Sequence, residues 1–219
     1  MTSLTSPPIH RWRAFSLLAV AAFMTVMDLT IVNTALPTIG RKLHFSQTSL
    51  LWVVTAYELA YGGFLLLGGR AADLLGRRRV IIAGLAVFTA ASLGASLAGS
   101  EAVLIAMRAA QGFGAAMFLP AALSTVRNMF TEGAERNKAL GIWGALAALG
   151  ATAGLVFGGL LTRFAGWQYV FWLNVPVGTV ALLLMRRVVP APQPTRGASA
   201  IAYASSTSAP VTVTAPSGS

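Results

Sequence analysis

Six long apolar segments, joined by short links that carry most of the charge, constrain what this chain can fold into. A helix needs about 20 predominantly apolar residues to cross the hydrocarbon core of a bilayer. The sequence offers six such segments, at residues 14–36, 50–67, 80–97, 103–126, 139–162 and 167–185. Because the links are short, neighbouring helices are expected to run antiparallel. The predicted fold class is therefore an all-α membrane protein, a bundle of six transmembrane helices.

Composition excludes most soluble classes of protein. The chain is 56% hydrophobic and only 10% charged, whereas a soluble domain carries about 25% charged residues. The net charge of +10 would indicate nucleic acid as a partner of a soluble protein, but here the basic residues lie between apolar segments, which is typical of membrane topology. With no cysteine and two distant histidines, His10 and His44, no metal site is expected. We predict no enzyme activity, no cofactor and no nucleic-acid partner; the lipid bilayer is the expected surrounding.

The positions of Lys and Arg predict the orientation. With the N-terminus inside, twelve of the sixteen basic residues fall on the cytoplasmic side, three fall outside, and Arg108 lies within a helix. Because cytoplasmic loops carry the basic excess, both termini are predicted to be cytoplasmic in a multi-pass protein of the cell membrane. The first apolar segment is too long for a signal peptide and contains Asp28, so it is interpreted as a retained helix.

The chain divides into three segments on this basis. Residues 1–13 form a cytoplasmic N-terminus and residues 14–188 form the transmembrane unit. Residues 189–219 are rich in Ala, Ser, Thr and Pro and carry one charge, at Arg196. This composition is typical of disorder, so a low-complexity tail is predicted there.

Three ionisable residues lie within the predicted helices: Asp28, Glu58 and Arg108. Counting 1.5 Å per residue from the outer helix ends places them about 12, 12 and 8 Å deep. A long Arg side chain spans that difference, so the cation and both carboxylates are expected to meet in the outer half of the bundle. Two interpretations remain open: a fixed ion pair that sets helix packing, or a protonatable carboxylate whose charge Arg108 tunes.

The sequence G-G-R-A-A-D-L-L-G-R-R-R at residues 68–79 links the second and third helices. Two glycines permit tight turns, a lone acid can bond to backbone amides or to an arginine, and the closing arginines hold the link on the cytoplasmic side. A link that served only topology would not require this spacing. The candidate residues of this conformational link are Gly69, Asp73, Gly76, Arg77 and Arg78.

Two further helices combine small residues with a defined face. In L-I-A-M-R-A-A-Q-G-F-G-A-A, residues 104–116, Arg108 and Gln111 share a face with small residues that permit close helix approach. In G-A-T-A-G-L-V-F-G-G, residues 150–159, glycine recurs at every fourth position. A glycine stripe of this kind indicates close packing against another helix. The glycines assigned to that packing are Gly150, Gly154, Gly158 and Gly159.

Together these motifs resemble the major facilitator superfamily. The run D-L-T-I-V-N-T-A-L-P, residues 28–37, is similar to that of its drug:proton antiporter group with fourteen helices. Residues 69–78 resemble the signature G-x-L-A-D-R-x-G-R-K, and residues 108–114 match R-x-x-Q-G-x-G. The sequence G-W-Q-Y-V-F-W-L-N-V-P-V-G, residues 166–178, also looks like the antiporter group. The resemblance covers roughly residues 12–188.

The resemblance implies a fold and a function. The fold would be the N-terminal half of the family's architecture, two inverted repeats of three helices each. A complete transporter would exchange inward-moving protons for outward-moving amphipathic or cationic compounds. Asp28 would be the proton or substrate carboxylate, with Arg108 as its charge partner and Glu58 and Gln111 as further coupling residues. The link that contains Asp73 would brace against the second half in one of the alternating states.

The sequence departs from the family pattern in three ways. Leu155 stands where the helix-five signature G-x-x-x-G-P-x-x-G-G has proline, and Glu58 is unusual for its place. Family members have two halves with substrate between them, whereas this chain has one. Two rival interpretations follow: a truncated remnant that does not transport, or a half-transporter that needs a separate second half or a homodimer mate.

Overall fold

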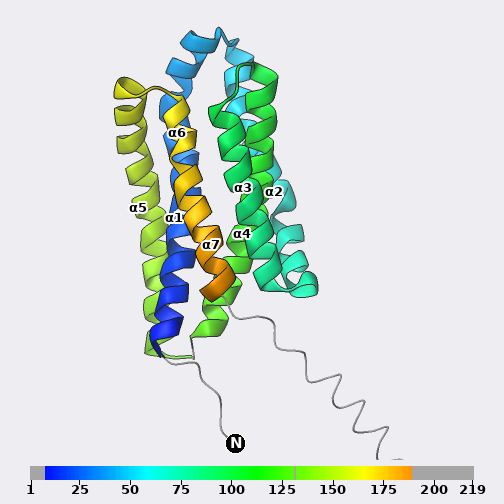
Figure 1. Ribbon diagram of the computed structural model, residues 1–219, viewed down its shortest axis with the longest axis vertical. Helices are drawn as coiled ribbons and strands as arrows, with labels where there is room; N and C mark the ends of the chain where they lie inside the picture. Colours follow the sequence, from blue (N-terminus) through cyan, green and yellow to red (C-terminus); the bar gives the residue numbers. More distant parts are fainter. Residues whose placement is uncertain (1–7, 131, 189–219) are drawn as a thin grey trace, which may run out of the picture.

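The protein, described by a computed structural model over residues 8–130 and 132–188, is a bundle of long helices (Figure 1). The helices are α1 (Pro8–Leu43), α2 (Gln47–Leu75), α3 (Arg77–Ser96), α4 (Glu101–Met129), α5 (Ala134–Phe164), α6 (Gln168–Trp172) and α7 (Asn174–Val188). Across the described residues, six helical stretches are long and apolar enough to cross a membrane, with α6 and α7 contributing to the sixth. The predicted six-helix all-α fold is confirmed. The tail predicted at residues 189–219 lies outside the described residues.

The first helix extends well beyond its predicted limits. It begins at Pro8 and continues through Pro37 to Leu43, past the apolar segment that ends at residue 36. A proline inside a helix removes one backbone hydrogen bond but does not have to end the helix. The last turns, which carry Arg41 and Lys42, reach across the upper end of the bundle toward the start of α2 (Figure 1).

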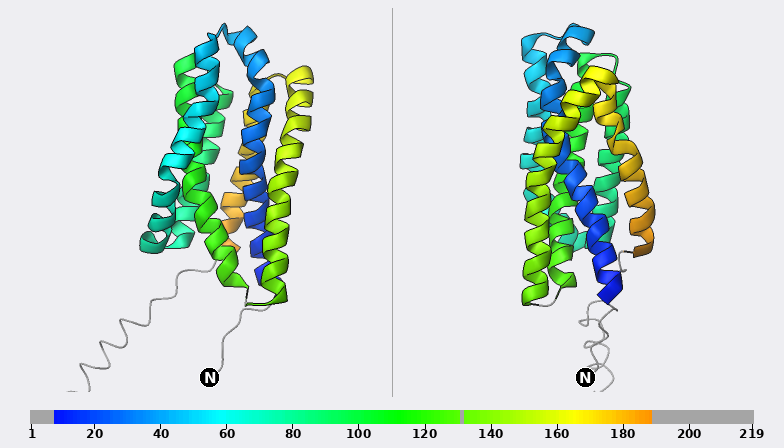
Figure 2. Two further views of the ribbon diagram at one scale, coloured as in Figure 1. Left: turned by 180° about the vertical axis from the view of Figure 1, so that it is seen from behind. Right: turned by 90° about the vertical axis from the view of Figure 1, so that its left-hand side faces the viewer.

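The link between α2 and α3 is a correction to the sequence analysis. We predicted a loop over residues 68–79, but α2 continues to Leu75 and α3 begins at Arg77. A single residue, Gly76, joins them with a φ of 91°, a conformation that favours glycine. Gly69 makes no turn, because it lies inside α2 beside open space. The joint lies at the same end of the bundle as the two ends of the described chain (Figures 1 and 2).

The sixth predicted span is interrupted in its middle. It divides at Leu173 into α6 and α7, with Asn174 as the first residue of α7. Pro176 has no backbone N–H and therefore cannot donate to the carbonyl of Trp172 one turn earlier. The break brings a polar residue, Asn174, to the first position after the interruption.

Two groups of helices make the bundle. In one, α5 packs along α1; in the other, α4 packs against both α2 and α3; the α6–α7 span contacts both groups (Figure 2). Contacts of α7 with α1 and α3 join the groups on one side. Glycine permits the closest approaches in each group, where a Cβ on Gly154 or Gly112 would meet the backbone of the neighbouring helix.

The glycine stripe of α5 faces α1 at three of its four predicted positions. Gly150, Gly154 and Gly158 are buried against the stretch of α1 between Phe23 and Thr34. Gly159 is exposed and has nothing near its Cβ position, so it takes no part in this packing. The glycine spacing therefore identified a helix interface but included one residue too many.

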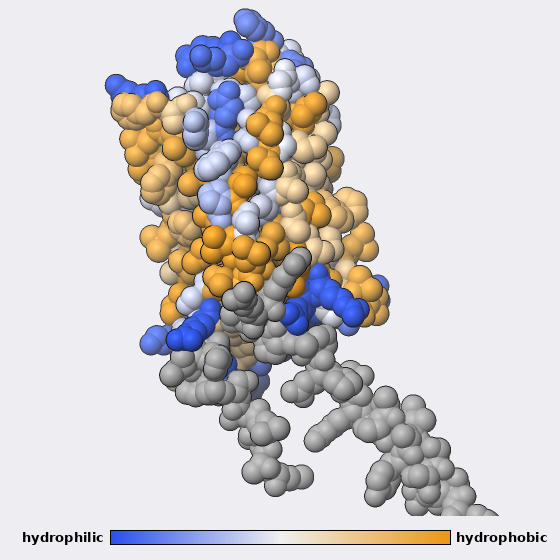
Figure 3. All heavy atoms as spheres, in the orientation of Figure 1, coloured by the Kyte–Doolittle hydropathy of each residue, from blue (hydrophilic) through white to orange (hydrophobic). Residues whose placement is uncertain are grey.

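The outward faces are apolar in the middle and hydrophilic toward the ends. Figure 3 shows hydrophobic residues over most of one side, with strongly hydrophilic residues gathered near the upper and lower ends. The most apolar windows of α2 and α5 are only 17% and 11% buried, compared with 61% for α1. Hydrophobic surface of this extent requires lipid or another protein against it.

Candidate functional site

A buried ion pair joins α1 to α4. Nη1 of Arg108 donates to Oδ2 of Asp28 at 2.6 Å, and the exposed fractions of the two side chains are 1% and 0%. The pair lies between two apolar clusters, one containing Met24 and Tyr57 and the other containing Ile31. An isolated charge in such surroundings is strongly disfavoured, so each of these two charges requires the other.

The guanidinium of Arg108 is held from three further directions. Its Nε donates to the backbone carbonyl of Val53 on α2 at 3.0 Å, and its Nη1 also donates to Oε1 of Gln111 at 2.9 Å. The ring of Tyr57 lies 4.3 Å from its central carbon, a cation–π distance. Arg108 is thus fixed by α2 as well as by α1.

The packing of α4 on α2 explains how a carbonyl of α2 reaches Arg108. Gly112, one turn after Arg108, lies directly against the carbonyl group of Tyr57. Without a side chain at that position the two backbones come close enough for the carbonyl of Val53, one turn before Tyr57, to face Arg108. The residues that build the site and the glycine that lets it close therefore share one face of α4.

Two side chains complete the surroundings of Asp28. Nε2 of Gln111 donates to Oγ of Ser92 on α3 at 2.7 Å and lies 3.4 Å from Oδ1 of Asp28. Nδ2 of Asn174 donates to the same Oδ1 at 2.6 Å, and Asn174 is fully buried. The site therefore draws on α1, α2, α3, α4 and α7.

Asn174 and Ser92 were missed at the level of the sequence. Neither is ionisable, and both lie in predicted apolar segments where hydropathy does not single them out. The signal that was available is the motif at residues 166–178, which contains Asn174. An amide in the middle of an apolar segment deserves the same scrutiny as a charge, because burying it without a hydrogen-bond partner is also costly.

Glu58 does not join this site, contrary to the prediction. It is exposed on α2 and makes no ion pair or hydrogen bond that the structure records with Arg108. Successive residues of a helix are rotated by about 100°, so a residue next to Tyr57 points elsewhere when Tyr57 faces Arg108. Equal depth in the membrane was not sufficient evidence of contact.

The joint at Gly76 holds a second Asp–Arg pair. Nη2 of Arg77 lies 3.8 Å from Oδ1 of Asp73, with exposed fractions of 39% and 70%. Asn128 on α4 lies beside Arg77. With the amide of Asn128 oriented so that its oxygen faces the guanidinium, this oxygen accepts from Nη2 of Arg77 at 3.2 Å. Arg78, which follows, is half-buried. The joint is thus tied to the end of α4, while Asp73 keeps most of its surface free.

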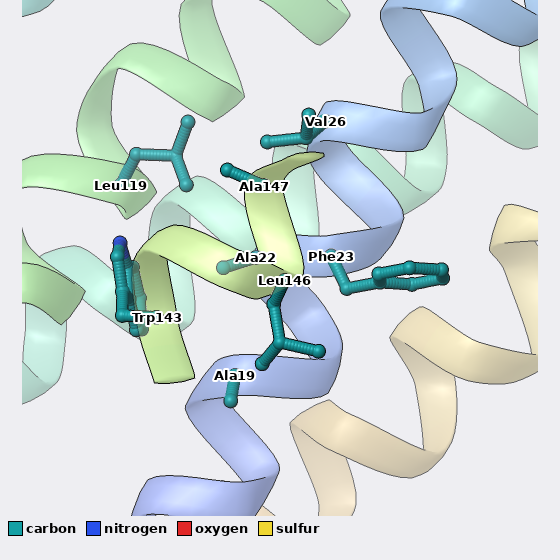
Figure 4. Close-up of a pocket in the computed structure, with 8 residues that line it drawn as sticks. All are labelled: Ala19, Ala22, Phe23, Val26, Leu119, Trp143, Leu146 and Ala147. Carbon is teal, nitrogen blue, oxygen red and sulfur yellow. The ribbon is translucent and has the colours of Figure 1, made fainter. Parts of the chain in front are cut away.

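A small apolar pocket opens where α1, α4 and α5 meet (Figure 4). Four residues of α1, one of α4 and three of α5 line it, and Trp143 is the largest of them. The lining residues are Ala19, Ala22, Phe23, Val26, Leu119, Trp143, Leu146 and Ala147. Such a lining favours an apolar or aromatic group over a charged one.

The motifs and this arrangement agree with a comparison against protein families. Residues 18–213 match the family model described as Major Facilitator Superfamily. The chain belongs to the major facilitator superfamily. The resemblance inferred from the motifs is therefore confirmed at the level of the superfamily, and a membrane transporter family accounts for the six apolar helices.

Curated relatives within this superfamily include resistance and export proteins. The chain is 46% identical over 177 residues to the puromycin resistance protein of Streptomyces alboniger, covering 81% of this chain and 35% of that protein. It is 44% identical over 192 residues to the cephamycin export protein of Amycolatopsis lactamdurans, covering 88% and 40%. It is also 40% identical over 178 residues to the multidrug resistance protein Stp of Mycobacterium tuberculosis, covering 80% and 33%. The chain thus spans between a third and two fifths of these relatives.

A solved structure supports the fold independently. A bacterial homologue of the human lysosomal transporter Spinster, in an inward-facing and unoccupied conformation, matches with a TM-score of 0.69 at 18% identity. The match covers 89% of this chain and 47% of that one. The described bundle therefore has the architecture of about half of a major facilitator transporter.

Proposed function

We propose that this chain forms the N-terminal half of a transporter that exports small amphipathic or cationic compounds in exchange for protons, within the drug:proton antiporter group with fourteen helices. The observation that carries the proposal is the buried pair of Asp28 and Arg108. Ionisable side chains inside a membrane are rare and mark ion or substrate pathways. The resistance and export proteins among the relatives support the direction of transport and the kind of substrate.

Asp28 is the proposed proton or cation site, and Arg108 is its charge partner. Burial disfavours the charged carboxylate, whereas an adjacent guanidinium favours it. These opposing effects allow a change in surroundings, such as arrival of a cationic substrate, to shift the balance between the charged and neutral forms. Gln111 bridges both side chains and belongs to the same unit. Glu58, exposed on α2, has no assigned place in this step.

The apolar pocket of Figure 4 is the proposed contact for the hydrophobic part of a substrate. Trp143 and Phe23 offer aromatic surface there, and the pocket lies against the same helix, α1, that carries Asp28. A compound with an apolar body and a cationic head matches the combination of these two features.

The exposed faces of α2 and α5 are the proposed contact with a second six-helix half. Alternating access needs one half to rock against another around a site at their interface. In this arrangement both termini are cytoplasmic in the cell membrane, and the joint with Asp73 and Arg77 braces against the second half on the cytoplasmic side. A homodimer is the second candidate, because a second copy of this chain would cover the same apolar faces.

The chain by itself is expected not to pump, because it offers only one side of the interface. We expect no proton-driven movement of a fluorescent amphipathic cation by the purified chain in liposomes with a pH gradient. Residues 1–188 fused to the part of the cephamycin export protein that follows the matched region should restore it. The matched control is the same fusion with Asp28→Asn, in which dye transport should no longer be coupled to protons.

Three results would contradict the proposal. Proton-dependent dye transport by a demonstrably monomeric chain, lost in Asp28→Asn, would show that one half suffices. Transport by the fusion that is unchanged by Asp28→Asn would remove the proton role from this carboxylate. A correctly folded fusion with no transport would favour the non-transporting remnant.

A further inference from the structure

The amide of Asn174 faces Asp28 with one of its two polar atoms unused. Its Nδ2 donates to Oδ1 of Asp28 at 2.6 Å, whereas its own Oδ1 is buried and has no hydrogen-bond partner. Buried acceptors almost always have a partner, so an exception calls for an explanation. Asn174 itself is fully buried at the start of α7, so bulk solvent does not supply the missing bond.

The two oxygens of Asp28 lie in different surroundings. Oδ2 accepts from the charged Nη1 of Arg108 at 2.6 Å. Oδ1 receives neutral donors only, from Asn174 at 2.6 Å and from Gln111 at 3.4 Å. A proton added to Oδ2 would lie against a cation, whereas a proton added to Oδ1 would not.

Within residues 8–130 and 132–188, the interactions recorded around the pair bring no competing charge. The groups that face Asp28 or its partner are Arg108 and Gln111 from α4, Tyr57 from α2, Ser92 from α3 by way of Gln111, Phe171 from α6 and Asn174 from α7. Among the bonds recorded for the described residues, Arg108 is the charged partner of Asp28.

From this geometry we infer that Asp28 takes its proton on Oδ1 and that Asn174 holds the proton there. The inference rests on the proposed function, in which Asp28 is the proton site. A proton from the aqueous phase forms an O–H bond on Oδ1, which then becomes a donor. Asn174 turns its amide so that its unused oxygen accepts this new bond, while Oδ2 keeps its bond to Arg108.

An amide suits both protonation states because it carries a donor and an acceptor on one carbon. When Asp28 is charged, Nδ2 of Asn174 donates to it; when Asp28 is neutral, Oδ1 of Asn174 accepts from it. The turn takes place at the interruption of the sixth span, where Asn174 follows Leu173. Asn174 is therefore a positioning residue that senses the charge of Asp28 from α7.

Infrared difference spectroscopy of the full chain in lipid nanodiscs tests the inference. Lowering the pH should produce a carbonyl band of the protonated carboxyl that disappears in Asp28→Asn. In Asn174→Leu, a substitution of similar size with no polar atom, this band should move to higher frequency because the O–H has lost its acceptor. Asn33→Leu is the matched control, since Asn33 is exposed on α1 and bonds to the carbonyl of Leu29; it should leave the band in place.

A second variant keeps the test informative if Asn174→Leu does not fold. Asn174→Asp sets a second carboxyl beside Oδ1 of Asp28, and two carboxylates this close share one proton. A protonated carboxyl band should then be present at neutral pH, where the unsubstituted chain shows less of it. Absence of that band in the folded variant would overturn the inference.

The outcomes separate the inference from the proposed function. An Asp28 band that stays at the same frequency in Asn174→Leu overturns the role of Asn174 and leaves Asp28 as the proton site. An unsubstituted chain with no Asp28-dependent band across the accessible pH range overturns both. A band that shifts in Asn174→Leu, together with a shared proton in Asn174→Asp, supports the inference whether or not the chain transports.

Discussion

Two Asp–Arg pairs in this bundle differ in almost every physical respect. Arg108 and Asp28 lie 2.6 Å apart with exposed fractions of 1% and 0%, and they join residues 80 positions apart. Arg77 and Asp73 lie 3.8 Å apart with exposed fractions of 39% and 70%, on consecutive turns across the α2–α3 joint. The first pair is enclosed by five helices, whereas the second lies at the end of the bundle.

The difference shows that the same two residue types can serve unlike purposes. A buried pair must be kept together because either charge alone is costly in an apolar interior. An exposed pair is surrounded by water and salt and contributes little to stability. If the exposed pair matters, the reason must be what it meets during transport.

A test of membrane orientation gives an all-or-none reporter signal. It also tests whether the α2–α3 joint, with Asp73 and Arg77, lies on the cytoplasmic side. A reporter active only outside the cytoplasm should be silent when fused after Arg187 and active when fused at Ser100. The reason is the basic excess on the side that includes the α2–α3 joint. The reverse pattern would move Asp73 and Arg77 to the outside and end the proposed role of the joint.

Removing one partner of the buried pair should produce the largest loss of stability. Arg108→Ala leaves Asp28 without its cation and is expected to lower the free energy of unfolding by about 3–5 kcal/mol. Adding Asp28→Asn should recover part of this loss, because the remaining group is then neutral. Unfolding of the purified chain in detergent, measured for both single variants and the double variant, gives the coupling energy.

The matched control for this cycle is Glu58→Gln combined with Arg108→Ala. Glu58 was expected beside Arg108 but is exposed on α2, so this second cycle should show no coupling. Coupling of Arg108 with Glu58 and not with Asp28 would contradict the arrangement of the site.

Glycine packing should have the next largest effect. Gly112→Ala would push a methyl group against the carbonyl of Tyr57 and separate α4 from α2, near the bond between Arg108 and Val53. Overpacking of this kind typically costs about 1–3 kcal/mol. The melting temperature in detergent should fall for Gly112→Ala and stay unchanged for Gly159→Ala, whose Cβ position faces open space. Equal melting temperatures for the two variants would mean that the close approach at Gly112 is not needed.

The sequence predicted the fold well because the membrane simplifies the problem. Backbone groups in a bilayer must bond within a helix, so six apolar segments leave little choice of architecture. The pairing of Asp28 with Arg108 was also predictable, because two opposite charges at membrane depth require each other. Helix ends were less predictable, since α1 continues as a helix beyond Pro37 and the link at residues 68–79 is helical on both sides of Gly76.

The rotation of each helix is what the sequence did not determine. Glu58 and Asp28 were assigned similar depths, but depth does not reveal which face of α2 meets α4. That choice depends on Gly112 and Tyr57, whose backbones touch. Asn174 was missed for a related reason: only the break at Leu173 and the packing of α7 bring its amide to Asp28.

The smallest expected change in stability belongs to the exposed pair of Asp73 and Arg77. Variants of this pair test whether the α2–α3 joint does more than fix the topology. Asp73→Asn, Arg77→Gln and the double variant should show a coupling of about 0–1 kcal/mol, because solvent screens the charges at 3.8 Å.

In the fusion with a second half, however, Asp73→Asn should reduce transport strongly if Asp73 braces against that half. The exposed Asp73 has most of its surface free for such a contact. A control variant, Glu132→Gln, removes a still more exposed acid that pairs with Arg136 outside the joint, and it should leave transport unchanged. Unimpaired transport in Asp73→Asn would mean that the joint fixes orientation alone, and the contrast between the two pairs would then reduce to burial.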